Sequence, residues 1–296
     1  MSTALTVTHY SDPGCPWAWS ASPHHAVLHW RYGGQLSWRL VMIGLAEDAS
    51  RYDARGYSPA RQAAGFLGFR RLGMPFDTQP RERNVGTGRA CRAVVAARLR
   101  EDPPRDLEVF RALQLARFTS DLLFDTDEGI RAALARVEGL DADALVAALD
   151  DPEVEEAYQA DRAEVRTAEG SPTAFQGKSA NTDGAERYTA PSLVFRHADG
   201  RSLEAGGFQP VEAYDVCIAN LDPGLPRREP AEDPVEVLRE FPYPLTTREV
   251  AAVMAAHLVE PDDAAAEEAL IAAAANGDVR REGVGNGALW HLTGRR

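Results

Sequence analysis

The chain has 296 residues, 44 % hydrophobic and 26 % charged, which is the composition of a globular protein with a sizeable core. We expect no membrane insertion, because no apolar run approaches the ~18–20 residues needed to span a bilayer. The N-terminus lacks the basic segment and the following apolar segment of a signal peptide, so export by a signal peptide is not expected. The net charge of −13, from 32 basic and 45 acidic residues, argues against a nucleic-acid partner.

The three cysteines are Cys15, Cys91 and Cys217, too few and too scattered for a disulfide framework or a zinc site. In a chain without an export signal we expect them to be reduced thiols. Almost every basic residue is arginine, and Lys178 is the only lysine, which we attribute to genome composition. The open question is whether one of the three sulfurs is reactive.

The first elements in the chain are predicted to be a strand over residues 5–10 and a turn over residues 11–14. A helical stretch from Cys15 to about residue 31 follows, and Gly33-Gly34 ends it. Residues 36–45 then predict a second strand, because alternate positions are apolar. The chain therefore leads from a strand directly into a cysteine at a helix N-terminus.

Helical signals dominate residues 58–169, and the polar stretch 170–188 is predicted to be a surface loop. Strand character returns at residues 191–195, and Asp199-Gly200 predicts a hairpin to a short strand over residues 202–205. Gly206-Gly207 leads into a helix from residue 210 to about residue 219. A strand–helix–strand start followed by a hairpin and a helix predicts a split α/β fold.

Cys15 lies where a helix N-terminus would favour a thiolate, because the first-turn N–H groups are unpaired and the macrodipole is positive there. Pro16 suits the first helical position, since its missing N–H would have no partner there. The alternative from these two residues alone is a small apolar side chain at a strand–helix turn.

The segment Asp-Pro-Gly-Cys-Pro-Trp-Ala after an N-terminal strand resembles the active-site segment of the DsbA-like branch of the thioredoxin superfamily. Members carry a helical domain inserted into a thioredoxin-like fold and a cis-proline loop, which Thr189-Ala190-Pro191 matches. The resemblance covers about residues 4–222, and it implies a thioredoxin-like domain over residues 1–222 with a helical insertion over about 58–169. It also implies that Cys15 is the catalytic nucleophile, that Pro191 lies against it, and that the Thr189–Ala190 backbone pairs with a thiol-bearing substrate.

One departure from the family pattern restricts the redox reactions that are open to Cys15. The family motif is Cys-Pro-x-Cys, but Ala18 stands where the second cysteine would be. Cys15 therefore cannot close a local disulfide, whereas exchange with a small thiol needs only one cysteine. Cys91 and Cys217 share helical faces with apolar residues and are predicted to be core residues, although either could in principle resolve Cys15.

Two further features are candidates for binding substrate. Gly206-Gly207 is similar to the Gly-Gly turn with which glutaredoxins hold the γ-glutamyl end of glutathione and to a loop of kappa-class glutathione transferases, although a tight turn alone would also explain it. Trp17, inside the motif, is expected to flank a substrate cleft together with Pro16. His24 and His25 are expected to be structural, and no metal-binding motif is present.

Residues 223–296 carry 8 arginines and 13 acidic residues, and five prolines between residues 223 and 242 mark their start as a domain boundary. Helices over about 246–257 and 262–275 followed by a hairpin around Asn286-Gly287 resemble a small α+β winged-helix arrangement. The candidate recognition helix has four acidic residues and no basic ones, so we expect protein contact or packing and not DNA binding.

These observations favour a cytoplasmic thiol–disulfide oxidoreductase with one catalytic cysteine, which forms a mixed disulfide with a low-molecular-weight thiol. The arginine-rich composition is that of a GC-rich actinobacterium, and related proteins there use mycothiol, so mycothiol is preferred to glutathione. The alternatives are a thiol-dependent isomerase, like 2-hydroxychromene-2-carboxylate isomerase or kappa-class transferases, and a redox-inactive binding module. The expected partner is a small thiol or a thiolated substrate, and a homo-oligomer is compatible with the sequence.

Overall fold

The computed structural model of the protein describes residues 5–181 and 184–294. Its central sheet contains four strands: β1 (Leu5–Ser11), β2 (Leu36–Met42), β5 (Ser192–His197) and β6 (Ser202–Ala205). The order across the sheet is β2-β1-β5-β6, with β1 parallel to β2 and the other two pairs antiparallel. This is the split α/β arrangement that the sequence predicts, and the fold is thioredoxin-like.

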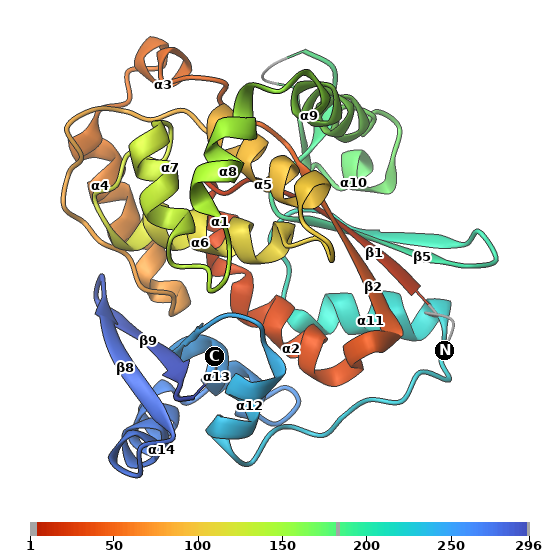
Figure 1. Ribbon diagram of the computed structural model, residues 1–296. Coiled ribbons are helices and arrows are strands. Elements are labelled where there is room, and N and C mark those ends of the chain that lie inside the picture. Colours follow the sequence, from red (N-terminus) through yellow and green to blue (C-terminus); the bar gives the residue numbers. More distant parts are fainter. Residues whose placement is uncertain (1–4, 182–183, 295–296) are drawn as a thin grey trace.

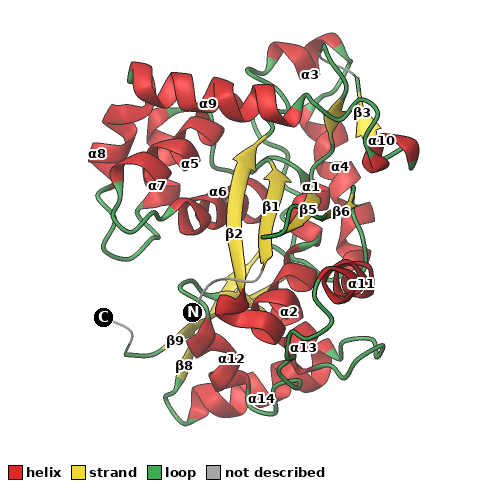
Figure 2. Ribbon diagram, turned by 90° about the vertical axis from the view of Figure 1, so that its right-hand side faces the viewer, coloured by secondary structure: helices red, strands yellow, loops and turns green. Residues whose placement is uncertain are grey.

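One face of the sheet is covered by α2 (Ser22–Tyr32) and α11 (Val211–Leu221), whose apolar side chains pack against Leu5 and Val7. The predicted single helix after Cys15 is in fact two, because α1 (Pro16–Ser20) ends at Ala21. Pro23 explains the break, since it has no N–H to continue the ladder and its ring would clash with the carbonyl of Trp19. Figure 2 shows β1, β2 and β5 at the centre of the molecule.

A block of helices connects β2 to β5 and forms the largest hydrophobic cluster, built mainly from α5, α6 and α7–α9 (Figure 1). The helices and short 3-10 turns of this block are α3 (Ser50–Ala54), α4 (Pro59–Phe69), Arg70–Leu72, α5 (Gly88–Arg100), α6 (Asp106–Thr119), α7 (Asp127–Leu134), α8 (Ala142–Ala147), Ala148–Asp150 and α9 (Pro152–Val165). The predicted helical insertion is present, and it starts earlier than residue 58 because α3 precedes α4.

Residues 170–188 differ from the predicted surface loop. They contain the short helix α10 (Pro172–Phe175), which Ser171 caps, and the two-stranded ribbon of β3 (Ser179–Ala180) and β4 (Arg187–Tyr188). Arg187 and Tyr188 are buried, so the end of this stretch belongs to the core beside the sheet. The polar composition of this stretch predicts a loop, whereas tertiary contacts hold these short elements in place.

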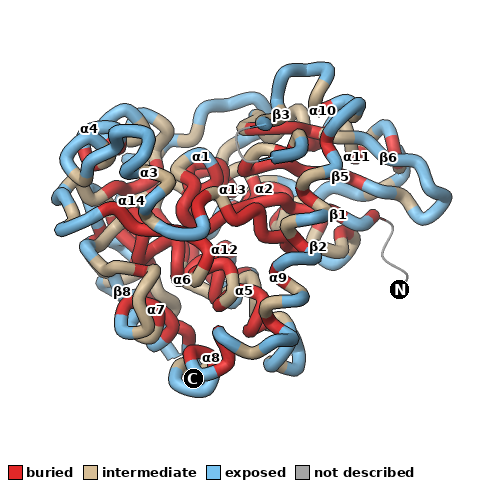
Figure 3. The backbone as a smooth tube through the Cα atoms, turned by 90° about the horizontal axis from the view of Figure 1, so that it is seen from above, coloured by how far each residue is buried: buried red, intermediate tan, exposed pale blue. Residues whose placement is uncertain are grey.

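The C-terminal part contains α12 (Pro234–Glu240), β7 (Leu245–Thr246), α13 (Thr247–Met254), α14 (Asp263–Ala275), β8 (Val279–Val284) and β9 (Gly287–Leu292). The two predicted helices and the terminal hairpin are present, and β7 adds a third strand beside β9. This part shares one hydrophobic cluster with α2, and Figure 3 shows both α2 and α13 as mostly buried. Across the described ranges, no helix is long and apolar enough to cross a bilayer.

Candidate active site

The turn after β1 places Cys15 at the N-cap position of α1. The Cys15 N–H donates to the carbonyl of Asp12 at 3.1 Å, and the Cys15 carbonyl accepts from the Trp19 N–H at 3.1 Å. Pro16 occupies the first turn, where no N–H partner is lost. The sulfur therefore lies at the start of the helix, as the motif predicts.

The Cys15 side chain faces the loop before β5. Its Sγ donates to the carbonyl oxygen of Ala190 at 3.2 Å, and the Ala190–Pro191 peptide bond is cis. Cys15 is only 6 % exposed, and Ala18 packs in the same buried cluster. The structure thus brings together Cys15, Ala18, Ala190 and Pro191 from two distant parts of the sequence.

The protonation of Cys15 differs from the sequence-based expectation of a favoured thiolate. Burial raises the pKa of the Cys15 thiol to about 12, and the nearby Asp12 carboxylate contributes in the same direction. The backbone N–H groups of Ala18 and Trp17 lower the pKa, as a helix N-terminus should, but they do not outweigh the loss of water. At neutral pH the sulfur is a thiol that donates a hydrogen bond.

Asp12 organises the turn that carries Cys15. Its carboxylate accepts from the N–H groups of Gly14 (2.8 Å) and Leu45 (2.7 Å) and from the Thr87 hydroxyl (2.9 Å). The thiol of Cys91 approaches the same carboxylate at 3.6 Å. Asp12 is fully buried, and burial raises its pKa above the usual value. It therefore links the motif turn to the β2–α3 connection and to the start of α5.

Sequence reasoning treats Asp12 only as a turn residue and misses this role. The available signal is its position three residues before Cys15, between a buried strand and a helix, where a carboxylate must be hydrogen-bonded if it is buried. The partners Leu45 and Thr87 come from segments that no local pattern connects to residue 12.

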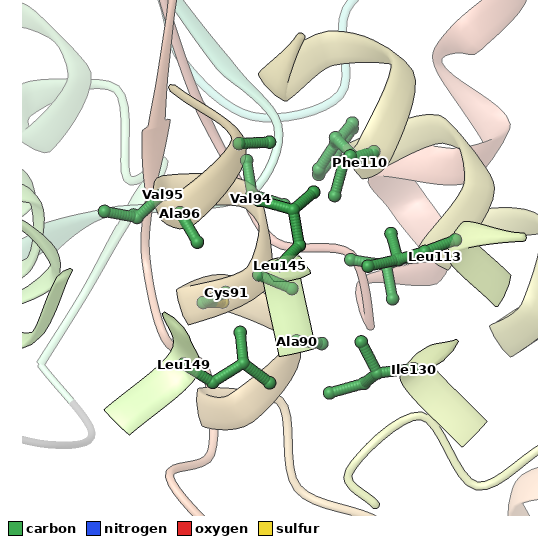
Figure 4. Close-up of a cluster of buried hydrophobic side chains, with 14 of the residues drawn as sticks. Ala90, Cys91, Val94, Val95, Ala96, Phe110, Leu113, Ile130, Leu145 and Leu149 are labelled. Atoms are coloured by element: carbon green, nitrogen blue, oxygen red, sulfur yellow. The ribbon is translucent and has the colours of Figure 1, made fainter. Parts of the chain in front are cut away.

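The other two cysteines belong to other hydrophobic clusters than Cys15 does. Cys91 is fully buried in the cluster that α5 forms with its neighbouring helices (Figure 4). Cys217 is half-buried on α11 and contacts the cluster between that helix and the sheet. All three cysteines are free thiols in the structure.

An aromatic patch, which we define as Trp17, His24, Phe69 and Phe208, lies beside the motif. The Trp17 side chain is 42 % exposed, and its ring centroid lies 4.9 Å from that of Phe69 and 5.5 Å from that of Phe208. His24 lies 5.2 Å from Phe208, and its Nδ1 is 2.8 Å from the carbonyl of Gln209. The patch joins α1, α2 and the end of α4 to the loop after β6, whereas His25 is buried.

Gly206 and Gly207 are buried and close to residues 173–178. Gly207 has a positive φ of 72°, and a Cβ on Gly206 would lie 2.4 Å from Thr173 Cγ2, so both positions favour glycine. The Gly207 N–H already donates to Ser192 Oγ at 3.0 Å. This donor is therefore occupied, and the tight packing itself accounts for the Gly-Gly pair.

Thr189 is anchored next to this turn, because its hydroxyl donates to the carbonyl of Lys178 at 2.6 Å. Its own carbonyl accepts from Ser192 Oγ at 2.6 Å.

Within the described residues, no group of three or more His, Cys, Asp or Glu side chains is placed to hold a metal ion.

Three solved structures resemble this chain at 18–20 % identity, a level that speaks to the fold alone. A protein disulfide isomerase candidate from Nitrosomonas europaea has a TM-score of 0.55 at 18 % identity, covering 73 % of this chain and 97 % of its own. The cytosolic disulfide reductase DsbM from Pseudomonas aeruginosa has a TM-score of 0.50 at 19 % identity, covering 73 % and 99 %. A DsbA oxidoreductase candidate from Streptomyces coelicolor has a TM-score of 0.52 at 20 % identity, covering 77 % and 93 %.

A search among curated proteins gives no significant match. The family model described as a DSBA-like thioredoxin domain matches residues 6–190, which is more than half of the chain and ends one residue before the cis-proline. The strand that leads into Cys15, the helical insertion and the Ala190–Pro191 loop are all inside or at the edge of that match. The chain belongs to the DsbA-like thioredoxin family.

Proposed function

We propose that the protein is a thiol–disulfide oxidoreductase in which Cys15 alone exchanges with a low-molecular-weight thiol. The observation that carries the proposal is the pairing of Cys15 Sγ with the Ala190 carbonyl beside cis-Pro191, with Ala18 in the place of a second cysteine. A single sulfur at this position supports mixed-disulfide chemistry but not a local dithiol cycle.

The exchange proceeds in two balanced steps. Cys15 loses its proton and attacks the disulfide of an oxidised small thiol, so that one S–S bond breaks, a Cys15 mixed disulfide forms, and the leaving thiolate takes up a proton. A second thiol then attacks the mixed disulfide, forms a new disulfide and returns Cys15 to the thiol state. In the mixed disulfide Cys15 has no proton to donate, so the Ala190 carbonyl becomes free to accept from an N–H of the bound thiol.

Burial of Cys15 bears on the rate of exchange. A thiol whose pKa is raised to about 12 is a poor leaving group, so expulsion of Cys15 from its mixed disulfide is slow. The site therefore favours retention of a thiolated adduct over rapid delivery of a disulfide to other proteins. Slow expulsion of Cys15 would limit the second step of exchange in either direction, so a carrier role suits this balance better than rapid turnover.

The small thiol is mycothiol or glutathione, with mycothiol preferred on the arginine-rich composition. The fold comparison includes the Pseudomonas aeruginosa disulfide reductase solved with GSH, at 18 % identity and a TM-score of 0.50, covering 73 % of this chain and 98 % of its own. A cytoplasmic location agrees with the cytosolic description of that protein. Pro16, Trp17 and the Thr189–Ala190 backbone would border the bound thiol, and Gly206-Gly207 would shape the wall behind it.

The raised pKa of Cys15 also favours a second candidate, a redox-inactive binding module that uses the same surface without covalent chemistry. A thiol-dependent isomerase is a third, in which the thiol is bound as a cofactor and Cys15 is dispensable. The three functions differ in what they require of the sulfur.

Intact-protein mass spectrometry after incubation with oxidised glutathione or mycothiol disulfide distinguishes them. Thiol–disulfide exchange predicts one adduct on the wild type, its loss in Cys15→Ser, and its retention in the control Cys217→Ser. Absence of any adduct favours the binding module, and labelling of Cys91 or Cys217 alone contradicts the proposal. Isomerase activity that persists in Cys15→Ser would support the third function.

A further inference from the structure

Three histidines lie together at the contact between α2 and the central sheet. His25 and His29 are four residues apart on α2 and so share a face of that helix, and His9 comes from β1. The ring centroids of His9 and His25 are 4.6 Å apart. His29 stacks on Trp38 of β2 at a centroid distance of 4.5 Å. We call His9, His25 and His29 the histidine cluster, and the proposed exchange at Cys15 uses none of them.

The cluster and its neighbours contain buried polar atoms without a hydrogen-bond partner among the described residues. These atoms are Nε2 of His9 and of His25, Nε1 of Trp38 and the hydroxyl oxygen of Tyr214. His25 is central to the group, because its ring centroid lies 6.1 Å from that of Trp38 and 5.9 Å from that of Tyr214. Burial of an unpartnered polar atom costs free energy, and the cost is far larger for a charged ring than for a neutral one. A proton added to the cluster is therefore strongly disfavoured.

The groups that face the cluster offer it no carboxylate within the described part of the chain. The electrostatic effects on His9 and His25 come from other histidines, namely His29 for His9, and His9, His24 and His29 for His25. The remaining contacts are aromatic side chains from four elements: Trp38 of β2, Phe110 of α6, Tyr214 of α11 and Phe241 after α12. A positive charge in the cluster would thus meet further histidines and no counter-ion.

Charged residues on the same elements interact away from the cluster. The ion pairs are Arg31 with Asp215, Arg39 with Glu164, Arg98 with Asp161, Arg111 with Glu249 and Arg228 with Glu240. Glu212 of α11 acts on His24. Asp106 of α6 is affected by Arg98. The cluster therefore remains without compensation on every element that packs against it.

Burial keeps the cluster neutral in the folded protein. It lowers the pKa of His9 to about 3 and the pKa of His29 to about 4, and it lowers the pKa of His25 well below its ordinary value. In the unfolded chain a histidine titrates near ~6.5. Between these values the unfolded chain binds more protons than the folded one. The contribution to stability is therefore complete above about pH 6.5 and is lost as the pH falls toward about 4.

We propose that the histidine cluster is an acid-sensitive switch, which holds α2 on the central sheet only while its three rings are neutral. The same helix packs against the C-terminal core through Ala26, Val27 and Trp30, and it directly follows the short helix that begins after Cys15. Protonation of the cluster would therefore dismantle the candidate active site together with the contact to the C-terminal part. The proposal does not depend on thiol exchange at Cys15.

Urea denaturation of the full chain at pH 7 and at pH 5 tests the switch. Each histidine that is neutral in the folded protein and titrates near ~6.5 in the unfolded chain should raise the unfolding constant about 20-fold between the two pH values. His25→Leu should remove one such factor, and so should His29→Leu, which changes the half-buried edge of the cluster and keeps the comparison if His25→Leu does not fold. His257→Gln is the matched control, because His257 is an exposed histidine after α13, and it should change the increase by less than about twofold.

Titration of the histidine ring protons by NMR is a second readout that needs no variant. The three cluster rings should stay neutral in the folded wild type down to pH 5. Cys15→Ser should keep the pH dependence of the wild type, which separates the switch from the proposed function. The proposal is overturned if the cluster rings titrate above pH 6 in the folded protein, if the folded leucine variants keep the full increase in the unfolding constant, or if His257→Gln loses as much of it as they do.

Discussion

Two sulfurs in this molecule lie near the start of a helix and near the same carboxylate. Cys15 is at the N-cap of α1, and Cys91 is in the first turn of α5, where its N–H donates to the Thr87 carbonyl. Asp12 raises the pKa of both thiols, in each case after the larger effect of burial. Only Cys15 has a cis-proline loop and an exposed tryptophan beside it.

The difference shows that a helix N-terminus does not by itself make a cysteine reactive. Both sulfurs lie near the positive end of a helix dipole, and burial keeps both protonated. Exposure separates them, because Cys91 is fully buried among apolar side chains of α5 and its neighbours (Figure 4), whereas Cys15 is 6 % exposed and lies two residues before the exposed Trp17. Chemistry at Cys15 therefore depends on its neighbours more than on its own helix.

The largest expected contrast is in alkylation of the native protein. Cys91 can react only after its core opens, which costs several kcal/mol, so we expect iodoacetamide to label Cys91 at least about 1000-fold more slowly than Cys15. Peptide mapping after timed labelling measures both rates, and in concentrated urea the two should converge. Equal native rates would remove the basis of the comparison.

The shared carboxylate should have the next largest effect, on stability. Asp12→Ala leaves the buried N–H groups of Gly14 and Leu45 without their acceptor, so we expect a loss of about 3 kcal/mol in the free energy of unfolding. Urea denaturation measures it, with Asp12→Asn as the control that keeps one acceptor oxygen. A loss below about 1 kcal/mol in Asp12→Ala would show that these contacts do not hold the turn.

The pH dependence of labelling tests the state of Cys15. Because its pKa is raised to about 12, the thiolate fraction should grow about tenfold per pH unit from pH 7 to pH 10 without levelling off. The unfolded chain, with an ordinary thiol pKa near ~8.5, should level off above pH 9. A plateau in the native protein below pH 9 would mean that the helix N-terminus prevails over burial.

The smallest expected effect concerns the surface next to Cys15. Trp17 is 42 % exposed, so Trp17→Ala should change stability little but weaken formation of the small-thiol adduct about threefold through lost aromatic contact. Quantitative mass spectrometry of the adduct measures this, and Trp17→Phe should retain most of it. An unchanged adduct yield in Trp17→Ala would place the bound thiol on another side of Cys15.

The sequence predicts most of the elements because their signals are local. The strand before Cys15 and the hairpin around Asn286-Gly287 are both present. The prediction of one helix after Cys15 misses the break at Ala21, which Pro23 causes because it interrupts the helical hydrogen-bond ladder. The structure adds β4, where Arg187 is buried despite its charge.

The site is less predictable, because its properties come from contacts across long sequence separations. No pattern near residue 15 reveals that the Ala190 carbonyl accepts from its sulfur, or that Asp12 meets Leu45 and Thr87. The family resemblance supplies the cis-proline loop but not the burial that reverses the expected pKa of Cys15. The winged-helix resemblance, the identity of the small thiol and the domain limits at 222/223 stay predictions.

The packing of α2 has a consequence for how the protein melts. Its Ala26, Val27 and Trp30 belong to the same buried cluster as Val250 and Leu270 of the C-terminal part, and Arg228 stacks 3.4 Å from the Trp30 ring centroid. The helix α2 thus packs against the thioredoxin-like sheet on one side and against the C-terminal core on the other. Heat should therefore unfold both parts in one cooperative transition, and a chain cut at residue 222 would expose an apolar helix face to water.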